Sequence, residues 1–222
     1  MKRFSVAAVS FALAACVGAG GPRGQLKPVA NPSAVVAAEL AFARLAQDKG
    51  QWAAFRATAA DGAEMFVPHR VKAADWLKGR AEPAIAVKWQ PHAVWSSCDG
   101  SYAVTRGNWE SPNASGTFAT IWQRQKNGEH KWVGDMSLTS EGPMPPPEMI
   151  AARVADCKTR PVAPIAEQPL NNGDYVPGAS ADGTLRWSTS VAPDGARSVT
   201  VSLWNGTAFE PVLRQLTQAA QR

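Results

Sequence analysis

The sequence of 222 residues predicts an α+β fold, with helices first and a curved antiparallel sheet after them. Two observations carry this prediction. Apolar residues recur at three-and-four spacing between residues 33 and 80, as in amphipathic helices, and at even spacing in the segments after residue 84, as in strands. Asp99-Gly100 and Asn127-Gly128 separate the later segments, and such pairs are typical of β-hairpin turns.

The first part of the chain is expected to hold three helices. Ser33 is the expected N-cap of the first helix, which ends near Asp48 and has its recurring apolar positions at Val36, Leu40, Ala43 and Leu45. A second helix is expected over residues 52–60, where the turn Asp61-Gly62 ends it. A short apolar strand at residues 65–67 and a third helix over residues 71–80 follow.

Four longer strands are then expected, over residues 84–97, 102–110, 116–126 and 131–138. A two-residue loop at Asn127-Gly128 would pair Trp122 with Val133 and Thr120 with Asp135. The first domain is thus expected over residues 33–140.

Residues 141–222 are expected to form a Pro-rich linker, a short helix and a small β-meander. Pro147 suits the first turn of a helix over residues 148–156, and residues 159–181 are rich in loop formers. Strands are expected over residues 185–191, 198–204 and 207–213. Since three strands alone are marginally stable, we expect this meander to pack on the first domain.

Three segments of the first domain resemble SnoaL-like proteins of the nuclear transport factor two-like superfamily. They read AADGAEMFVP at residues 59–68, SCDGSYAVTRGNWE at residues 97–110, and GTFATIWQR with KWVGD at residues 116–124 and 131–135. They occur in the family's order, and the resemblance covers residues 33–139. It implies a cone-shaped, cystatin-like α+β barrel. The superfamily includes isomerases, dehydratases and epoxide hydrolases, and also members that only bind or self-associate through the outer face of the sheet.

In enzymes that this chain resembles, an acid or base lies inside the cone, where apolar walls raise a carboxyl pKa. The candidates here are Asp61, Asp135 and His69. Each also has a simpler interpretation: Asp61 as a turn residue, Asp135 as a hydrogen-bond partner of the backbone or of Trp132, and His69 as a surface side chain.

The aromatic residues are a further indication of a site. Seven of the nine Trp fall in the first domain, Trp89 among them. An apolar ligand pocket inside the cone would draw on Trp52, Phe66, Trp76, Trp95, Trp109, Trp122 and Trp132. The same residues would equally suit a filled core, because alternate strand residues point to opposite faces.

Several function classes lack support in the sequence. There is no paired metal-ligand spacing, no phosphate-binding loop and no dinucleotide fingerprint, so neither a metal nor a cofactor is expected. The formal charge is +5, but Lys and Arg do not cluster, so nucleic-acid binding is not expected either.

Residues 1–15 predict a secretory signal peptide. Lys2 and Arg3 precede an apolar run that is too short to span a bilayer, and Leu13-Ala14-Ala15 leads into Cys16. This sequence resembles the lipobox of bacterial lipoproteins, in which the Cys carries the lipid, including palmitate. Val17, rather than Asp, favours the outer membrane, facing the periplasm. Residues 16–32 would be a flexible tether. The alternative is an ordinary signal peptide with a chance Cys.

With Cys16 assigned to lipid, Cys98 and Cys157 remain. Two thiols in an oxidising envelope predict a disulfide, and the alternative is two unpaired thiols.

These observations leave three hypotheses for function. The first is a cell-envelope lipoprotein whose domain binds a small apolar molecule or an envelope partner without catalysis. The second is an isomerase- or dehydratase-type enzyme that uses Asp61 or Asp135. The third is a structural module that forms homodimers through the outer sheet face.

Overall fold

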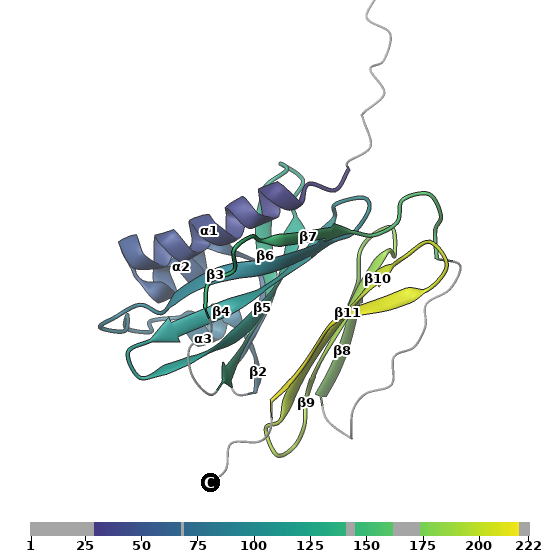
Figure 1. Ribbon diagram of the computed structural model, residues 1–222. Coiled ribbons are helices and arrows are strands. Elements are labelled where there is room, and N and C mark those ends of the chain that lie inside the picture. The colour runs from purple at the N-terminus through teal and green to yellow at the C-terminus, as the bar shows by residue number, and fades with distance from the viewer. Residues whose placement is uncertain (1–28, 68, 141–144, 162–173, 218–222) are drawn as a thin grey trace, which may run out of the picture.

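The computed structural model describes residues 29–67, 69–140, 145–161 and 174–217, which form two packed sheets with helices on one of them (Figure 1). The expected signal segment, the expected lipidation site Cys16 and most of the expected tether lie outside the described residues. Within the described ranges, none of the helices has the length and apolar character needed to cross a membrane.

Helix α1 (Pro32–Lys49) begins earlier than expected. Asn31 is its N-cap, because the Asn31 Oδ1 accepts a hydrogen bond from the Ala34 N–H at 3.1 Å, and Pro32 takes the first helical position. Ser33, the expected cap, therefore lies inside the helix. Residues 30–32 are also part of the fold rather than a tether, since the Ala30 N–H donates to the Cys98 carbonyl at 3.0 Å.

The inner face of α1 also differs from the expectation. The helix buries Val35, Glu39, Phe42 and Ala46, whereas Leu40 is 45% exposed. Both stripes have helical spacing, so periodicity alone does not choose between them. Contacts with the Trp residues of the sheet determine which face is buried. Phe42 packs against Trp89 with ring centroids 4.8 Å apart, and Glu39 accepts hydrogen bonds from the indoles of Trp89 and Trp122.

The first sheet has seven strands in the order β2-β1-β6-β5-β4-β3-β7. The strands are β1 (Ala59–Phe66), β2 (Arg70–Lys72), β3 (Lys88–Ser96), β4 (Tyr102–Ser111), β5 (Ala114–Arg124), β6 (His130–Ser140) and β7 (Ala151–Val154). Strands β3 to β6 are antiparallel, while β1 joins β6 and β7 joins β3 in parallel. With α1, α2 (Gln51–Thr58) and α3 (Ala73–Leu77) on one side of this sheet, the α+β class and the cone-shaped arrangement are confirmed.

The segment between α2 and α3 is more extended than expected. Asp61-Gly62 is not a turn but part of β1, where Gly62 has φ 75° and the pairing with β6 shifts between Ala59 and Glu64. Residues 70–72 form β2 against β1 instead of starting a helix, because the Glu64 carboxylate pairs with Arg70 and Lys72 across the hairpin. This pairing shortens α3 to Ala73–Leu77.

The expected register of the last hairpin is half right. Thr120 pairs with Asp135 as predicted, but Trp122 pairs with Trp132 rather than Val133. The reason is a loop over residues 125–129 instead of two residues, which leaves one residue more on β6 and a bulge beside Trp122. As a result, Trp122 and Trp132 both face the helices.

The second sheet has four strands in the order β11-β10-β9-β8, not three. Strands β9 (Leu185–Val191), β10 (Arg197–Trp204) and β11 (Phe209–Thr217) were expected, and β8 (Asp174–Ala179) pairs with β9 inside the segment expected as loop. The expected helix over residues 148–156 is wrong. Ala151–Val154 instead extends the open edge of β3 as β7, and the Ala155 N–H continues the ladder by donating to Ser96 O.

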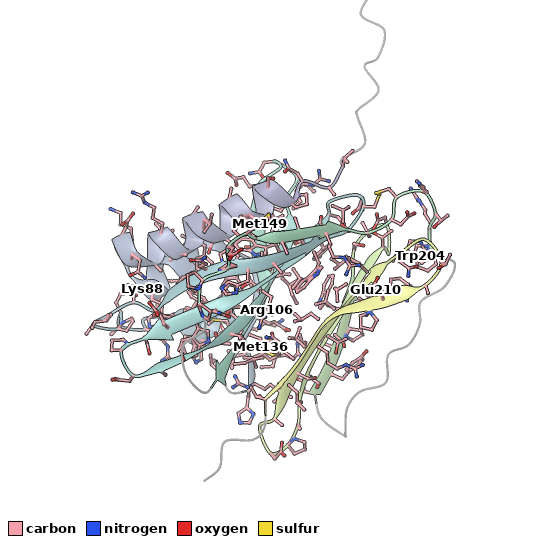
Figure 2. The ribbon with its side chains drawn as sticks, in the orientation of Figure 1. Lys88, Arg106, Met136, Met149, Trp204 and Glu210 are labelled. Atoms are coloured by element: carbon pink, nitrogen blue, oxygen red, sulfur yellow. A yellow bond between two sulfur atoms is a disulfide. The ribbon has the colours of Figure 1, made fainter. Side chains whose placement is uncertain are left out.

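The second sheet covers the face of the first sheet that lies opposite the helices, as expected for a meander too small to stand alone. An apolar core fills the space between the sheets, with Met136 visible there in Figure 2. Its buried members include Phe66, Trp95, Val104, Met136, Leu185, Val199 and Val201. The outer face that the resemblance associates with self-association is therefore occupied by the chain's own second sheet, so it is not free for a second copy.

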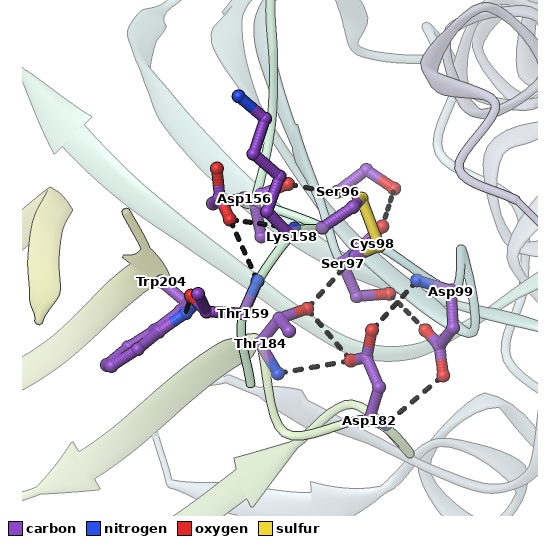
Figure 3. The surroundings of a disulfide bond; sticks show 12 residues. Ser96, Ser97, Cys98, Asp99, Asp156, Lys158, Thr159, Asp182, Thr184 and Trp204 are labelled. Carbon is purple, nitrogen blue, oxygen red and sulfur yellow. Dashed lines mark hydrogen bonds between the residues drawn. A yellow bond between two sulfur atoms is a disulfide. The ribbon is translucent and has the colours of Figure 1, made fainter. Parts of the chain in front are cut away.

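A disulfide fixes this arrangement (Figure 3). Cys98, in the turn after β3, is bonded to Cys157, which follows β7, with Cα atoms 5.3 Å apart. Beside it the backbone N–H of Asp99 donates to the Asp182 carboxylate at 2.9 Å, and that of Asp182 donates to the Asp99 carboxylate at 3.1 Å. The disulfide thus ties the β3–β4 turn to the segment that follows β7, and the reciprocal turn contacts join that end of the first sheet to the second sheet.

Candidate functional site

A pocket of about 240 Å³ lies between the helices and the sheet face that they cover. Its apolar wall comes from α1, α2 and strands β3 to β5, with Val67 and Val87 from the connections: Phe42, Trp52, Phe55, Val67, Val87, Trp89, Trp109 and Phe118. Four polar residues complete it, namely Gln51, Thr120, Asp135 and Ser137. The pocket is therefore mainly aromatic, with a single acidic group.

The aromatic wall is held by edge-to-face contacts. Phe42 lies 4.8 Å from Phe55 and 4.8 Å from Trp89, measured between ring centroids. Trp109 fits because its strand partner is Gly116: a Cβ at that position would come within 2.7 Å of the indole. The Trp109 indole N–H is satisfied by the Thr117 carbonyl at 3.1 Å. The rings are thus positioned by packing, which favours a preformed pocket.

Asp135 projects from β6 into this wall. It is 8% exposed, and its Oδ2 accepts a hydrogen bond from the Thr120 hydroxyl at 2.9 Å, its one partner within the described residues. The pKa of Asp135 is raised to about 7: burial is the largest cause, the charge of Glu39 also raises it, and the Thr120 hydrogen bond lowers it. Near neutral pH this carboxyl can therefore either donate or accept a proton.

Glu39 is a second buried carboxyl, which the sequence analysis missed. Its Oε1 accepts from the Trp89 indole at 2.8 Å, and its Oε2 accepts from the Thr105 hydroxyl at 2.6 Å and the Trp122 indole at 3.0 Å. Burial raises the pKa of Glu39, against these three hydrogen bonds, which lower it. The sequence held one indication of this role. Glu39 lies on the same helix face as Phe42, and the buried Trp N–H groups of the chain need acceptors.

The buried Asp135 carboxyl should make the protein less stable as the pH rises. Its pKa is about 7 in the folded chain against an ordinary 3.8, so between these values the folded state binds the extra proton. Stability present near pH 4 is lost by about pH 7, and the loss between pH 5 and pH 8 is about 2–3 kcal/mol.

Asp135→Asn has no proton to lose, so its melting temperature relative to wild type should rise by roughly 5–10 °C over the same interval. Melting curves of both proteins at the two pH values measure this. Asp61→Asn, at an exposed position on β1, is the control and should follow wild type. If the difference in melting temperature between Asp135→Asn and wild type does not change with pH, Asp135 is not the group that titrates in this range.

The structure brings two of the seven expected aromatic residues to the pocket, Trp52 and Trp109. Trp122 and Trp132 are fully buried structural residues, and the Trp132 indole donates to the Thr58 hydroxyl at 3.0 Å. Trp76 packs against Trp52, with ring centroids 4.9 Å apart, but does not line the pocket. Trp89 lines it too, together with Phe42, Phe55 and Phe118, whose apolar side chains carried no separate signal in the sequence.

Phe66 and Trp95 are corrections to the expected pocket. Both belong to the core between the two sheets and not to the cone. On β1 the residue before Phe66 is Met65, which faces the helices, so strand alternation directs Phe66 to the other side.

Two of the three proposed acid–base residues lie away from the pocket. Asp61 and His69 are both exposed and neither lines it. Within the described ranges, no group of three or more His, Cys, Asp or Glu side chains could hold a metal ion. Asp135 is thus the candidate that the structure places in an apolar cavity.

Two further pockets are lined by described residues. One of about 280 Å³ is lined by Lys88, Trp89, Gln90, His92, Asn108, Trp109, Glu110 and Pro146, and its carboxylate, Glu110, is exposed. The other, of about 220 Å³ between the sheets, contains Glu64, which is paired with Arg70 and Lys72. Neither has a buried carboxyl without a cationic partner, so the aromatic pocket is the best candidate site.

Comparisons with known proteins give no family assignment: no family model matches the chain, and no curated protein matches it. Among solved structures, the chain is similar to a protein described as a candidate ketosteroid isomerase, from Kribbella flavida DSM 17836. The identity is 16%, the match covers 53% of this chain and 86% of that one, and the TM-score is 0.36. An NTF-2 like protein of unknown function from Burkholderia xenovorans LB400 is 16% identical over 51% of this chain and 88% of that one, with a TM-score of 0.34.

At these identities and TM-scores, no residue role or activity is carried over from either protein. Residues 33–139 nevertheless have the architecture that their resemblance to SnoaL-like proteins implied, a curved sheet covered by helices. Their pocket is aromatic and is lined by one acidic side chain, Asp135.

Proposed function

We propose that the cone binds a small, mainly apolar molecule whose one polar group meets Asp135. The observation that carries this proposal is a carboxyl that is 8% exposed, lies among six aromatic rings and has one hydrogen-bond donor, Thr120. A buried carboxyl with unused acceptor capacity is costly unless a ligand satisfies it. The rings supply the apolar contact, and Asp135 supplies orientation.

Cyclohexanol is a suitable probe, because it is apolar, carries one hydroxyl and does not absorb with Trp. We expect saturable binding to wild type by calorimetry at pH 8. Asp135→Leu keeps the wall apolar but removes the acceptor, so the affinity should fall roughly tenfold or more, the value of a hydrogen bond to a charged group. Asp61→Leu, at an exposed position, should bind as wild type does. Equal affinity of wild type and Asp135→Leu would refute the proposal, as would the absence of saturable binding of both cyclohexanol and a small alkylammonium probe.

The pKa of Asp135 also favours a second candidate function, proton transfer of the isomerase or dehydratase type. A carboxyl with a pKa of about 7 is matched to a neutral pH and can take a proton from the carbon beside a ketone. Hydrogen–deuterium exchange of cyclohexanone in D₂O, followed by NMR, distinguishes the two functions. Exchange that wild type accelerates and Asp135→Asn does not would favour the enzyme, and equal background exchange would favour binding alone.

We further propose that the mature chain is an outer-membrane lipoprotein facing the periplasm. Leu13-Ala14-Ala15-Cys16 supports this, and the disulfide is compatible with an oxidising compartment. In this location, the domain could bind another envelope protein instead of a small molecule. Lipid on Cys16 would hold the domain at the membrane, since two or three acyl chains anchor firmly where one does not.

Cys16→Ser should abolish this anchoring. We expect the variant to remain unprocessed or to leave the membrane fraction, because the lipid attachment site is gone. Fractionation of cells that express either form, followed by mass analysis of the N-terminus, measures the change. Ala19→Ser, three residues later, is the matched control and should fractionate as wild type does. Membrane association of Cys16→Ser equal to wild type would exclude the lipobox.

A further inference from the structure

We infer that the ligand of the aromatic pocket is a small organic cation, a tertiary or quaternary amine. This inference rests on the proposed function and specifies its ligand class. It stands on the juxtaposition of an acidic group without a basic partner and six aromatic rings in one cavity.

The first step is the charge of the pocket. No Lys, Arg or His is among the described residues that line it. Six ion pairs join described residues elsewhere, and none includes Asp135 or Glu39. Glu39 does not line the pocket, but its charge raises the pKa of Asp135, as burial does. Glu39 is itself a carboxyl, so it does not neutralise Asp135. The cavity is therefore acidic and uncompensated by protein cations.

The second step is the wall. Aromatic rings carry a negative π face and attract a cation within about 6 Å of the ring centre, and recognition of quaternary ammonium groups by aromatic cages uses this attraction. Three Trp and three Phe line this pocket, and Trp gives the strongest such attraction. A neutral apolar ligand would use the rings but would leave the carboxylate unpaired, whereas an alkylammonium satisfies both.

The third step is size. A cavity of about 240 Å³ corresponds to on the order of eight water molecules in the liquid, so the cation is small. Thr120 already donates to one oxygen of Asp135, which leaves the other oxygen for the ligand. The protonation state then sets the preference: the ionised carboxylate above its pKa favours a cation, and the protonated form below it does not.

Choline and 3,3-dimethylbutan-1-ol test this inference, because they differ chiefly in an ammonium nitrogen against a carbon. Calorimetry with the full chain at pH 8 should show choline binding at least tenfold more tightly than the alcohol. The preference should shrink to less than threefold at pH 5.5 and in Asp135→Asn at pH 8. Near pH 6.5 choline binding should release protons, seen as a difference in binding heat between buffers of different ionisation enthalpy. Asp61→Asn should keep the full preference.

The outcomes separate this inference from the proposed function. If the alcohol or cyclohexanol binds and choline binds no better, the ligand is neutral, so the inference fails while the proposed function stands. The inference also fails if wild type prefers choline over the alcohol equally at both pH values, or if Asp135→Asn keeps this preference. In either case the carboxylate is not the group that recognises the cation. If none of the three probes binds, both fail.

Discussion

Glu39→Ala should destabilise the folded protein by about 3–5 kcal/mol. The substitution removes the acceptor of the Trp89, Thr105 and Trp122 hydrogen bonds at a position with 0% exposure and leaves a void in the wall. Trp122 and Thr105 retain a bond to each other, but Trp89 loses its acceptor. Relief of a buried charge offsets part of this cost.

Denaturant titration of wild type, Glu39→Ala and Glu39→Gln measures the loss. The loss of unfolding free energy in Glu39→Gln should lie between zero and that of Glu39→Ala, because one oxygen remains as an acceptor while the new NH₂ group faces a donor. This variant also keeps the test readable if Glu39→Ala does not fold. Leu40→Ala, on the same helix and 45% exposed, is the control and should cost under about 0.5 kcal/mol. A Glu39→Ala loss as small as that of Leu40→Ala would contradict the assigned network.

Removing the disulfide is the second large effect expected. The double variant Cys98→Ser, Cys157→Ser opens a loop with a sequence separation of 59 residues, which should cost about 4 kcal/mol in the chain-entropy model. The bond joins the β3–β4 turn to the segment after β7, so its loss should loosen the second sheet more than the pocket. Ligand affinity should change less than twofold.

Thermal melting of the double variant, and of wild type with reductant, measures this effect, and the two should agree. Ser101→Ala, in the same turn, controls for local disturbance: it removes one hydrogen bond, from the Ala181 N–H at 3.0 Å, and should cost about 1 kcal/mol. A double variant as stable as wild type would show that the Asp99 and Asp182 turn contacts alone hold the sheets.

The buried carboxyls link stability to the site. Glu39 binds two of the Trp indoles and also raises the pKa of Asp135. Glu39→Gln should therefore lower that pKa and extend the cation preference of the pocket to lower pH. The same residue supports the wall and adjusts the charge of the group that faces the ligand.

The sequence by itself determined the class of fold, the hairpin turns and the disulfide partners. These features depend on neighbours in the chain: period-two or three-and-four spacing, Asp-Gly and Asn-Gly pairs, and the count of Cys. Thr120 pairs with Asp135 as the two-residue turn predicted, but only because the bulge beside Trp122 compensates for the longer loop.

Only the tertiary structure decided which face each element buries and which groups meet. It turned α1 so that Glu39 lies inside and Leu40 outside, because the Trp89 and Trp122 indoles needed an acceptor. Residues 151–154 form a strand rather than a helix, because they pair with the edge of β3 that is otherwise open. The tertiary structure also separated Trp109, in the pocket, from Trp95, between the sheets, because neighbouring sheets and helices, rather than local propensity, fill the two faces of a strand.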